Sequence, residues 1–322
     1  MSRANKPPFL APIRGVIAIA AVVIWLTICF SVFFPISLLK ILIPIPRVQY
    51  WVTSILLGLT WLWIGFVNFM GRWASGIEID VQGLENINKR GHYFLFANHS
   101  AWTDIIILFQ LYHGRMPFPR WFMKHSLIWL PMIGYVCWAV DMPFMHRLKP
   151  SEAKKRPDLK GKDLENTRRA CEKFRHRPVV VVNYLEGTRF TWEKHRRSRS
   201  PYRNLLAPKL GGAGFTLNAM GELLEGIIDL TVVFSPGCEG TGMDYATGRI
   251  RKVVVRARIL PVPMDIVHCD LREDDAARIR FRDWVNEIWA YKDQQITEIK
   301  AQLVEEFGIE YDKPGIEQRA ES

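Results

Sequence analysis

The sequence predicts an α/β fold with a mixed, mostly parallel sheet flanked by helices, and an N-terminal hydrophobic two-helix membrane anchor. Three observations lead to this prediction: two long uncharged apolar stretches, β-rich stretches that alternate like strands, and helical stretches between them. Strands that alternate with helices favour parallel pairing, because each connecting helix covers a face of the sheet. The chain has 322 residues and 12% aromatic residues, which argues against disorder.

The N-terminal segment has the composition of a membrane anchor. Residues 15–39 and 48–71 carry no charge, and residues 1–72 contain six basic residues and no acidic one. Crossing the bilayer takes about 20 apolar residues. Residues 15–34 supply that length before Pro35, where we expect the helix to stop.

A secretory signal peptide is disfavoured, because the stretch is too long, lacks a cleavage site and is followed by a second apolar stretch. We therefore expect residues 1–72 to form a membrane-anchoring hydrophobic hairpin, either spanning or re-entrant. Buried core helices are the alternative. The basic residues at both ends favour a cytoplasmic position for the rest of the chain.

The rest of the chain divides into a folded body over residues 73–272 and a C-terminal amphipathic helix with a polar tail over residues 273–322. Apolar residues at three- and four-residue spacing between about 273 and 307 indicate a helix that packs on another element. The other expected helices are 103–112, 126–137, 163–176 and 214–225. The expected strands are 77–81, 93–97, 120–123, 140–144, 179–184, 227–234 and 253–259.

Charge and cysteine content exclude several classes of function. The net charge is +11, but six of these charges lie in residues 1–72, which leaves an excess of five over the other 250 residues. This small excess and the lack of a recognisable module argue against nucleic-acid binding. The five cysteines are scattered without a CxxC pair, so neither a disulfide framework nor a structural zinc site is expected.

The stretch YFLFANHSAWTDIIIL passes from a predicted strand through a turn into a helix. On a continuous helix His99 and Asp104 would lie about 140° apart, so they meet only if His99 folds back from the turn. A carboxylate that holds an imidazole fixes its tautomer and stabilises its cation, which is the arrangement of a general base. A structural pair that caps the helix is the alternative interpretation.

The stretch PVVVVNYLEGTRFT places Glu186, Gly187, Thr188 and Arg189 directly after a buried strand. Both motifs follow the carboxyl ends of predicted strands, so we expect them at the edge of the sheet where ligands bind. Gly187 lets backbone amides approach a ligand, and the planar guanidinium of Arg189 matches phosphate oxygens. The alternative is a glycine turn with a surface ion pair between Glu186 and Arg189.

Taken together, these motifs resemble the membrane-bound glycerolipid acyltransferases, specifically the 1-acyl-glycerol-3-phosphate (lysophosphatidate) acyltransferase family. NHSAWTD matches the family's Asn-His-x-x-x-x-Asp block, and EGTR matches its Glu-Gly-Thr-Arg block. Between them KHSLIWLPMIGYVCWAVDMPFMHR resembles a further block that begins with Lys124 and ends with Arg147, and PKLGGAG resembles the helix start after the EGTR block. The resemblance covers about residues 75–260.

Three departures from the family pattern bear on the acceptor more than on the reaction. Met145 and His146 precede Arg147 where the family usually has Asp or Asn next to the arginine. The fourth block reads LTVVFSPGCEG, with its proline late, and residues 190–207 are long and basic.

The resemblance implies the glycerolipid acyltransferase fold, with residues 73–272 as the catalytic domain, and transfer of a fatty acyl group from acyl-CoA or acyl-ACP. The acceptor would be the free sn-2 hydroxyl of 1-acyl-glycerol-3-phosphate, and the product phosphatidic acid for phospholipid biosynthesis. His99 would be the general base and Asp104 its partner, with no cofactor and no metal. The residues implied in binding the acceptor's phosphate are Lys124, Arg147, Glu186, Gly187, Thr188 and Arg189, with Glu186 fixing Arg189.

The implied partners are the lipid bilayer, the lysophospholipid acceptor and the acyl donor, at the cytoplasmic face of the cell (inner) membrane. Lysophosphatidylglycerol or glycerol 3-phosphate as acceptor, and a non-catalytic membrane protein that binds anionic lipids, are the alternatives. The basic stretch 194–203 has three interpretations: a solvated loop, a contact with anionic headgroups, or a docking site for an acidic acyl carrier protein.

Overall fold

A computed structural model describes residues 11–130, 132–145, 168–269, 271 and 273–311. Its centre is a six-stranded sheet in the order β1-β8-β7-β2-β6-β3. Within the described residues only the β7–β8 pairing is antiparallel in this sheet, so the predicted mixed, mostly parallel sheet is confirmed. The strands are β1 Glu78–Gln82, β2 His92–Ala97, β3 Pro119–Trp121, β6 Val179–Tyr184, β7 Gly226–Phe234 and β8 Lys252–Leu260.

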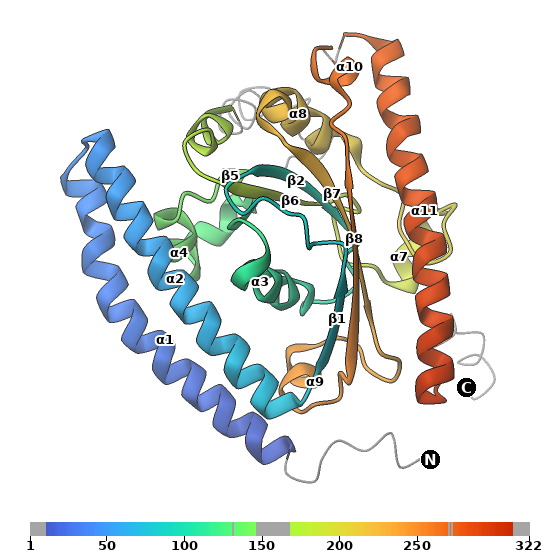
Figure 1. Cartoon of the computed structure of the whole chain (residues 1–322), viewed down its shortest axis with the longest axis horizontal. Helices are drawn as coiled ribbons and strands as arrows, with labels where there is room; N and C mark the ends of the chain where they lie inside the picture. Colours follow the sequence, from blue (N-terminus) through green and yellow to red (C-terminus); the bar gives the residue numbers. More distant parts are fainter. Residues whose placement is uncertain (1–10, 131, 146–167, 270, 272, 312–322) are drawn as a thin grey trace.

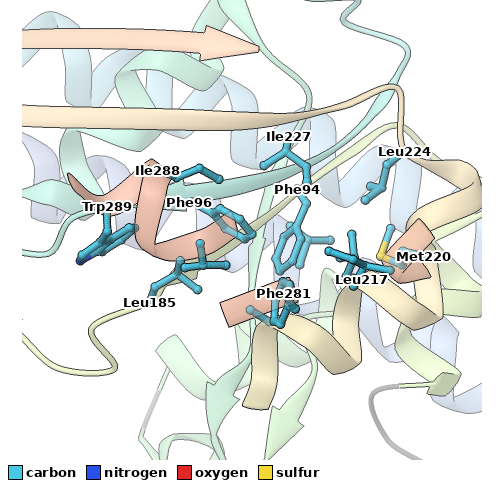
Figure 2. Packing of buried hydrophobic residues seen from close by; sticks show 14 of the residues in the cluster. Phe94, Phe96, Leu185, Leu217, Met220, Leu224, Ile227, Phe281, Ile288 and Trp289 are labelled. Atoms are coloured by element: carbon cyan, nitrogen blue, oxygen red, sulfur yellow. The ribbon is translucent and has the colours of Figure 1, made fainter. Parts of the chain in front are cut away.

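Helices cover both faces of the sheet. On one face lie α8 (Leu210–Met220), the long α11 (Asp275–Phe307) and the helical residues 168–174. Figure 2 shows Phe94 and Phe96 of β2 among side chains from α8 and α11, including Leu217 and Trp289. On the other face α3 (Asp104–Arg115) lies between the sheet and the N-terminal helices (Figure 1). β6 and β7 are largely buried on both sides and are mostly apolar, as such strands require, with Asp229 as a buried charged exception in β7.

The N-terminal hairpin consists of α1 (Ala11–Leu42) and α2 (Pro46–Ser75), which pack side by side (Figure 1). Both helices are long and apolar enough to cross a membrane. Of an 18-residue apolar segment in each helix, only 11% is buried in α1 and 28% in α2. One face of the hairpin packs on the body through a cluster that includes Leu56, Ile64 and Val140. The other face leaves its apolar side chains exposed.

The expected helix end at Pro35 is wrong, because α1 continues to Leu42. Beyond the proline the helix keeps contacts that outweigh the lost backbone hydrogen bond. The Ser37 hydroxyl donates to the Phe34 carbonyl and lies 2.6 Å from the Tyr135 hydroxyl, and Lys40 donates to Asp141. Neighbouring helices that supply such contacts make proline tolerable inside long apolar helices.

The segment between β3 and β6 differs most from prediction. The expected strand 120–123 is split, because Met123–Lys124 form β4, which pairs with β5 (Phe144–Met145) in a separate two-stranded sheet. The expected helix 126–137 is a 3-10 turn, His125–Trp129, followed by α4 (Ile133–Ala139). Of the expected helix 163–176, only residues from 168 onward are described, and they are helical to residue 174.

Of the expected strand 140–144, only Phe144 lies in a strand, β5, and the other four residues form a turn and an irregular segment. Asp141 takes a positive φ of 62°, which breaks an extended strand. Its carboxylate accepts hydrogen bonds from Lys40 of α1 and Thr53 of α2, so the hairpin fixes this turn. Three short helices among the described residues were not predicted: α7 (Trp192–Ser198), α9 (Gly242–Ala246) and α10 (Met264–Val267). The expected helix 214–225 corresponds to most of α8 followed by the 3-10 turn η3 (Gly221–Leu223).

Candidate active site

The His99 turn begins where β2 ends, and a buried asparagine holds it in place. The Asn98 side chain donates from Nδ2 to the Val232 carbonyl and accepts from the Val232 N–H at Oδ1, both at 2.9 Å. The side-chain amide therefore makes the two hydrogen bonds that a backbone peptide group would make, and it extends the pairing of β2 with β7 by one residue. This fixes the exit of the strand directly before His99.

His99 folds back over the first turn of α3, as the spacing requires. Its Nδ1 lies 2.8 Å from Asp104 Oδ2, and its side chain is 16% exposed. With Nδ1–H donating to the carboxylate, Nε2 is left with a free lone pair, the form that accepts a proton. The ring stacks on Tyr184 at 4.1 Å between centroids and 18° between planes, which holds its orientation. The predicted His99–Asp104 contact is confirmed.

Asp104 is a buried carboxylate surrounded by N–H donors. Besides His99, the backbone N–H groups of Ser100 and Ala101 donate to Oδ2 at 2.8 and 2.9 Å. Burial raises the pKa of Asp104, and these donors oppose that rise because they favour the ionised form. The carboxylate is thus held rigidly against the imidazole.

Glu186 has different partners from those expected. Its Oε1 accepts the His99 backbone N–H at 2.8 Å and its Oε2 accepts the Leu206 N–H at 3.0 Å, and the residue is 1% exposed. Both carboxylate oxygens of Glu186 therefore accept hydrogen bonds from backbone N–H groups. The structure does not show Glu186 orienting Arg189, as was expected. It also does not show the alternative, a surface ion pair between these two residues. Burial raises the pKa of Glu186 to about 7, against the effect of these two N–H donors.

We expect Glu186 to make stability depend on pH. The folded protein keeps a proton on this carboxyl that the unfolded chain, with the ordinary pKa of 4.5, has already released. Stability therefore falls as pH rises from about 4.5 to 7. Because glutamine does not ionise, the wild type should lose about 2–3 kcal/mol relative to Glu186→Gln between pH 5 and 8 in unfolding measurements. The exposed Glu193→Gln is the control, and parallel curves for wild type and Glu186→Gln would contradict the expectation.

The loop after Glu186 gathers positive charge next to the His99 turn. The Phe190 N–H donates to the His99 carbonyl at 2.7 Å, which ties the two motifs together. Gly187 has a φ of 68°, and the Lys209 side chain lies over it, 3.0–3.5 Å from where a Cβ would stand. Lys194 donates from Nζ to the Thr188 hydroxyl and the Arg189 carbonyl, both at 2.9 Å. Arg189 itself is exposed.

Sequence reasoning missed Lys194 and Lys209 as members of this site, although both lie within 22 residues of the EGTR motif. Lys124 lies in β4, just after β3, whose carboxyl end shares the sheet edge with that of β6. Its side chain is exposed. Arg147 lies outside the described residues. Where the structure is described, no three His, Cys, Asp or Glu side chains come together to hold a metal ion.

A buried charged cluster beneath the site was also missed. Lys292 of α11 is fully buried, and its Nζ lies 2.6 Å from Asp229 Oδ1 and donates to the Leu230 carbonyl at 2.6 Å. A longer contact of 3.5 Å reaches the Phe96 carbonyl, two residues before Asn98. Arg258 donates to the other Asp229 oxygen at 2.7 Å. The cluster joins α11 to the middle of β7 and to the end of β2 that precedes the site.

Comparison with known proteins gives this geometry a context. Residues 78–235 match the model of the acyltransferase family. A 1-acyl-sn-glycerol-3-phosphate acyltransferase 3 from Arabidopsis thaliana is 28% identical over 188 residues, which cover 53% of this chain and 46% of that protein. A 1-acyl-sn-glycerol-3-phosphate acyltransferase from Borreliella burgdorferi is 35% identical over 75 residues, 23% of this chain and 29% of that protein.

Among solved structures, the 1-acyl-sn-glycerophosphate (LPA) acyltransferase PlsC from Thermotoga maritima aligns with a TM-score of 0.46 at 16% identity. The alignment covers 90% of this chain and 98% of that one. The chain spans about half the length of the plant relatives it matches.

Proposed function

We propose that this chain is a membrane-bound O-acyltransferase, because residues 78–235 match the model of the acyltransferase family. In our proposal it transfers a fatty acyl group from acyl-CoA or acyl-ACP to the sn-2 hydroxyl of 1-acyl-glycerol-3-phosphate, giving phosphatidic acid. The observation that carries the proposal is that the matched region contains both the His99–Asp104 pair and the cationic loop tied to it. The names of the relatives support the choice of acceptor.

In the proposed mechanism the acceptor's hydroxyl is the nucleophile and His99 is the base. His99 Nε2 takes the hydroxyl proton as the oxygen attacks the thioester carbonyl. The tetrahedral intermediate then collapses, the C–S bond breaks, and the thiolate leaves and takes up the proton. Asp104, 2.8 Å from Nδ1, stabilises the imidazolium that forms in between. No enzyme nucleophile and no cofactor enter these steps.

The acceptor's phosphate is proposed to bind at the loop after β6. Arg189 supplies a planar pair of donors, Lys194 adds positive charge at the Arg189 backbone, and Lys209 adds positive charge at Gly187. Thr188 and Gly187 shape the loop, and we retain Lys124 and Arg147 as further candidates on the resemblance to the family. Glu186 is proposed to act as a positioning residue, because it holds the His99 backbone.

We further propose that residues 1–72 anchor the protein in a membrane, with residues 73–272 as the catalytic domain and 273–322 as its C-terminal helix and tail. The two apolar helices of the hairpin, mostly exposed, support the anchor. A diacyl product and a lysophospholipid acceptor both belong in a bilayer, which fits this arrangement. The cytoplasmic face of the cell (inner) membrane remains the proposed location.

The proposal is tested by offering acceptors in competition. The full chain in detergent micelles receives ¹³C-labelled oleoyl-CoA with equal amounts of unlabelled 1-oleoyl-glycerol-3-phosphate, lysophosphatidylglycerol and glycerol 3-phosphate, and labelled products are measured by mass spectrometry. We expect phosphatidic acid to dominate. A dominant diacyl phosphatidylglycerol or lysophosphatidate product would reassign the acceptor. No acylated product from any acceptor, with acyl-CoA and with acyl-ACP, would contradict the activity.

Replacing Arg189 with glutamine should raise the KM for lysophosphatidate. Hydrogen bonds to charged groups contribute about 1.5–3 kcal/mol, so we expect a rise of roughly 10- to 100-fold with little change in melting temperature. Arg196→Gln is the matched control, because this exposed arginine lies on the neighbouring α7. Equal KM values for the two variants would rule out a specific phosphate contact by Arg189.

A further inference from the structure

We propose that a cavity between α2 and α3 binds the headgroup of an anionic phospholipid, at a place separate from the His99–Asp104 pair. The cavity has a volume of about 560 Å³ and is lined from α2 by Asn68, Phe69, Arg72 and Trp73 and from α3 by Gln110 and His113. Gln110 and His113 come six and nine residues after Asp104, or about 9–14 Å further along the helix axis.

Two buried amides line this cavity with unsatisfied oxygens. Asn68 is 8% exposed and Gln110 is 6% exposed. Within the described part of the chain neither Asn68 Oδ1 nor Gln110 Oε1 has a hydrogen-bond partner. The other end of the Gln110 amide donates to the Tyr245 hydroxyl at 2.5 Å, which fixes its orientation. A buried acceptor without a donor costs about 1–3 kcal/mol, and because both oxygens are shielded from solvent, a small side-chain shift would turn them toward the hydroxyls of a ligand in the cavity.

The cavity also offers positive charge, and the Tyr245 hydroxyl lies directly behind Gln110. Arg72 is exposed, and none of the ion pairs found in the described residues involves it. Burial raises the pKa of Tyr245 to about 12, so its hydroxyl keeps its proton. Arg14 of α1 lies 5.9 Å from the centre of the Trp73 ring and adds a second cation at the rim. A phosphate is the group that a guanidinium with free donors recognises best.

Glycines in α2 make room for this arrangement. A Cβ at Gly65 would lie 2.7 Å from His113 Nε2, so only glycine lets the imidazole rest against the helix. The same ring stacks on Trp61 with centroids 4.2 Å apart. At Gly71 a Cβ would collide with the Tyr245 hydroxyl. The close approach of α3 and α9 to α2, visible in Figure 1, thus depends on these positions.

The rim of the cavity points to a lipid as the source of the phosphate. Phe69 is 64% exposed and Trp73 is 42% exposed, on a helix apolar enough to cross a membrane. Tryptophan and arginine together at the end of such a helix are typical of the headgroup level of a bilayer. Acyl chains can then follow the exposed face of α2 while the phosphate meets Arg72 and headgroup hydroxyls meet the two amides. A phosphatidylglycerol-type lipid has this chemistry and would bridge the hairpin to α3.

The test measures lipid binding by the full chain in neutral detergent micelles, so it rests on the proposed membrane attachment but not on acyl transfer. Dioleoyl phosphatidylglycerol and dioleoyl phosphatidylcholine are added at equal mole fraction, and bound lipid is counted by native mass spectrometry beside thermal unfolding. We expect phosphatidylglycerol to bind more tightly and to raise Tm. Arg72→Gln should weaken its binding by about tenfold or more.

Arg47→Gln is the matched control, because it removes the same charge from the other end of α2. Asn68→Leu is a second variant that removes an unsatisfied amide without changing charge, and it should also weaken phosphatidylglycerol binding. Equal binding of the two lipids, or equal losses in Arg72→Gln and Arg47→Gln, would overturn the site. If inorganic phosphate alone gives the same Arg72-dependent rise in Tm, the cavity is a small-anion site and the lipid assignment is wrong.

Discussion

Replacing His99 with alanine is expected to lower kcat for acyl transfer by about 10²–10⁴-fold, the usual contribution of a general base. The melting temperature should change little, because the Asp104 carboxylate keeps its two backbone N–H donors when the imidazole is removed. KM for both substrates should also stay within a few-fold, since neither the phosphate nor the acyl chain is held by this ring in our proposal. Steady-state kinetics in micelles measures all three quantities.

Two further variants make this expectation specific. His268→Ala is the control, because this exposed histidine directly follows α10, which packs against α8, η3 and α11. Adding Asp104→Asn to His99→Ala should cost no further activity if the two side chains act as one unit. A His99→Ala enzyme that keeps wild-type kcat would show that another group takes the proton.

The second large effect is expected on stability, from Lys292→Met. Methionine keeps most of the volume of the buried side chain but leaves Asp229 with Arg258 as its partner. Burial lowers the pKa of Lys292 and the charge of Asp229 raises it, so the charged form of Lys292 depends on Asp229. Breaking one side of a buried ion pair costs about 3–5 kcal/mol. With Arg258 still in place we expect a loss near the lower end, about 3 kcal/mol, in denaturant unfolding.

Lys300→Met tests whether this loss reflects the ion pair. Lys300 lies two turns further along α11 and donates to the neutral Asn204 amide oxygen at 2.9 Å. Its loss should cost about 1.5 kcal/mol, the lower end of the contribution of hydrogen bonds to charged groups, because this side chain is only half-buried. Equal losses in the two variants would mean that the Asp229 pair contributes nothing beyond an ordinary hydrogen bond.

The sequence predicts those parts of the fold that local patterns control. The strands β2, β6 and β7 appear where runs of β-branched and aromatic residues stand, because such strands are buried on both faces. The spacing allows a His99–Asp104 contact if His99 folds back from the turn before the helix, and the structure shows this contact. In both cases the pattern lies within a short stretch of the sequence.

The remaining features depend on residues far apart in the sequence. The turn at Asp141 is set by Lys40 and Thr53, about 100 and 90 positions earlier, and for this reason the prediction of a strand over residues 140–144 was wrong. Glu186 accepts hydrogen bonds from the backbone of His99 and Leu206 and does not pair with its neighbour Arg189. Lys292 lies nearly 200 residues after the His99 turn that its cluster supports. No local pattern carries such information.

The most direct test of the central claim is whether cleavage of the thioester requires the acceptor. Thiol release from oleoyl-CoA is followed for the full chain in micelles, with and without 1-oleoyl-glycerol-3-phosphate, and phosphatidic acid is measured in the same samples. If the acceptor's hydroxyl attacks the thioester directly with His99 as base, thiol appears only with acceptor and in equal amount to phosphatidic acid. Thiol release at the same rate without acceptor, or release with acceptor but without phosphatidic acid, would contradict the account.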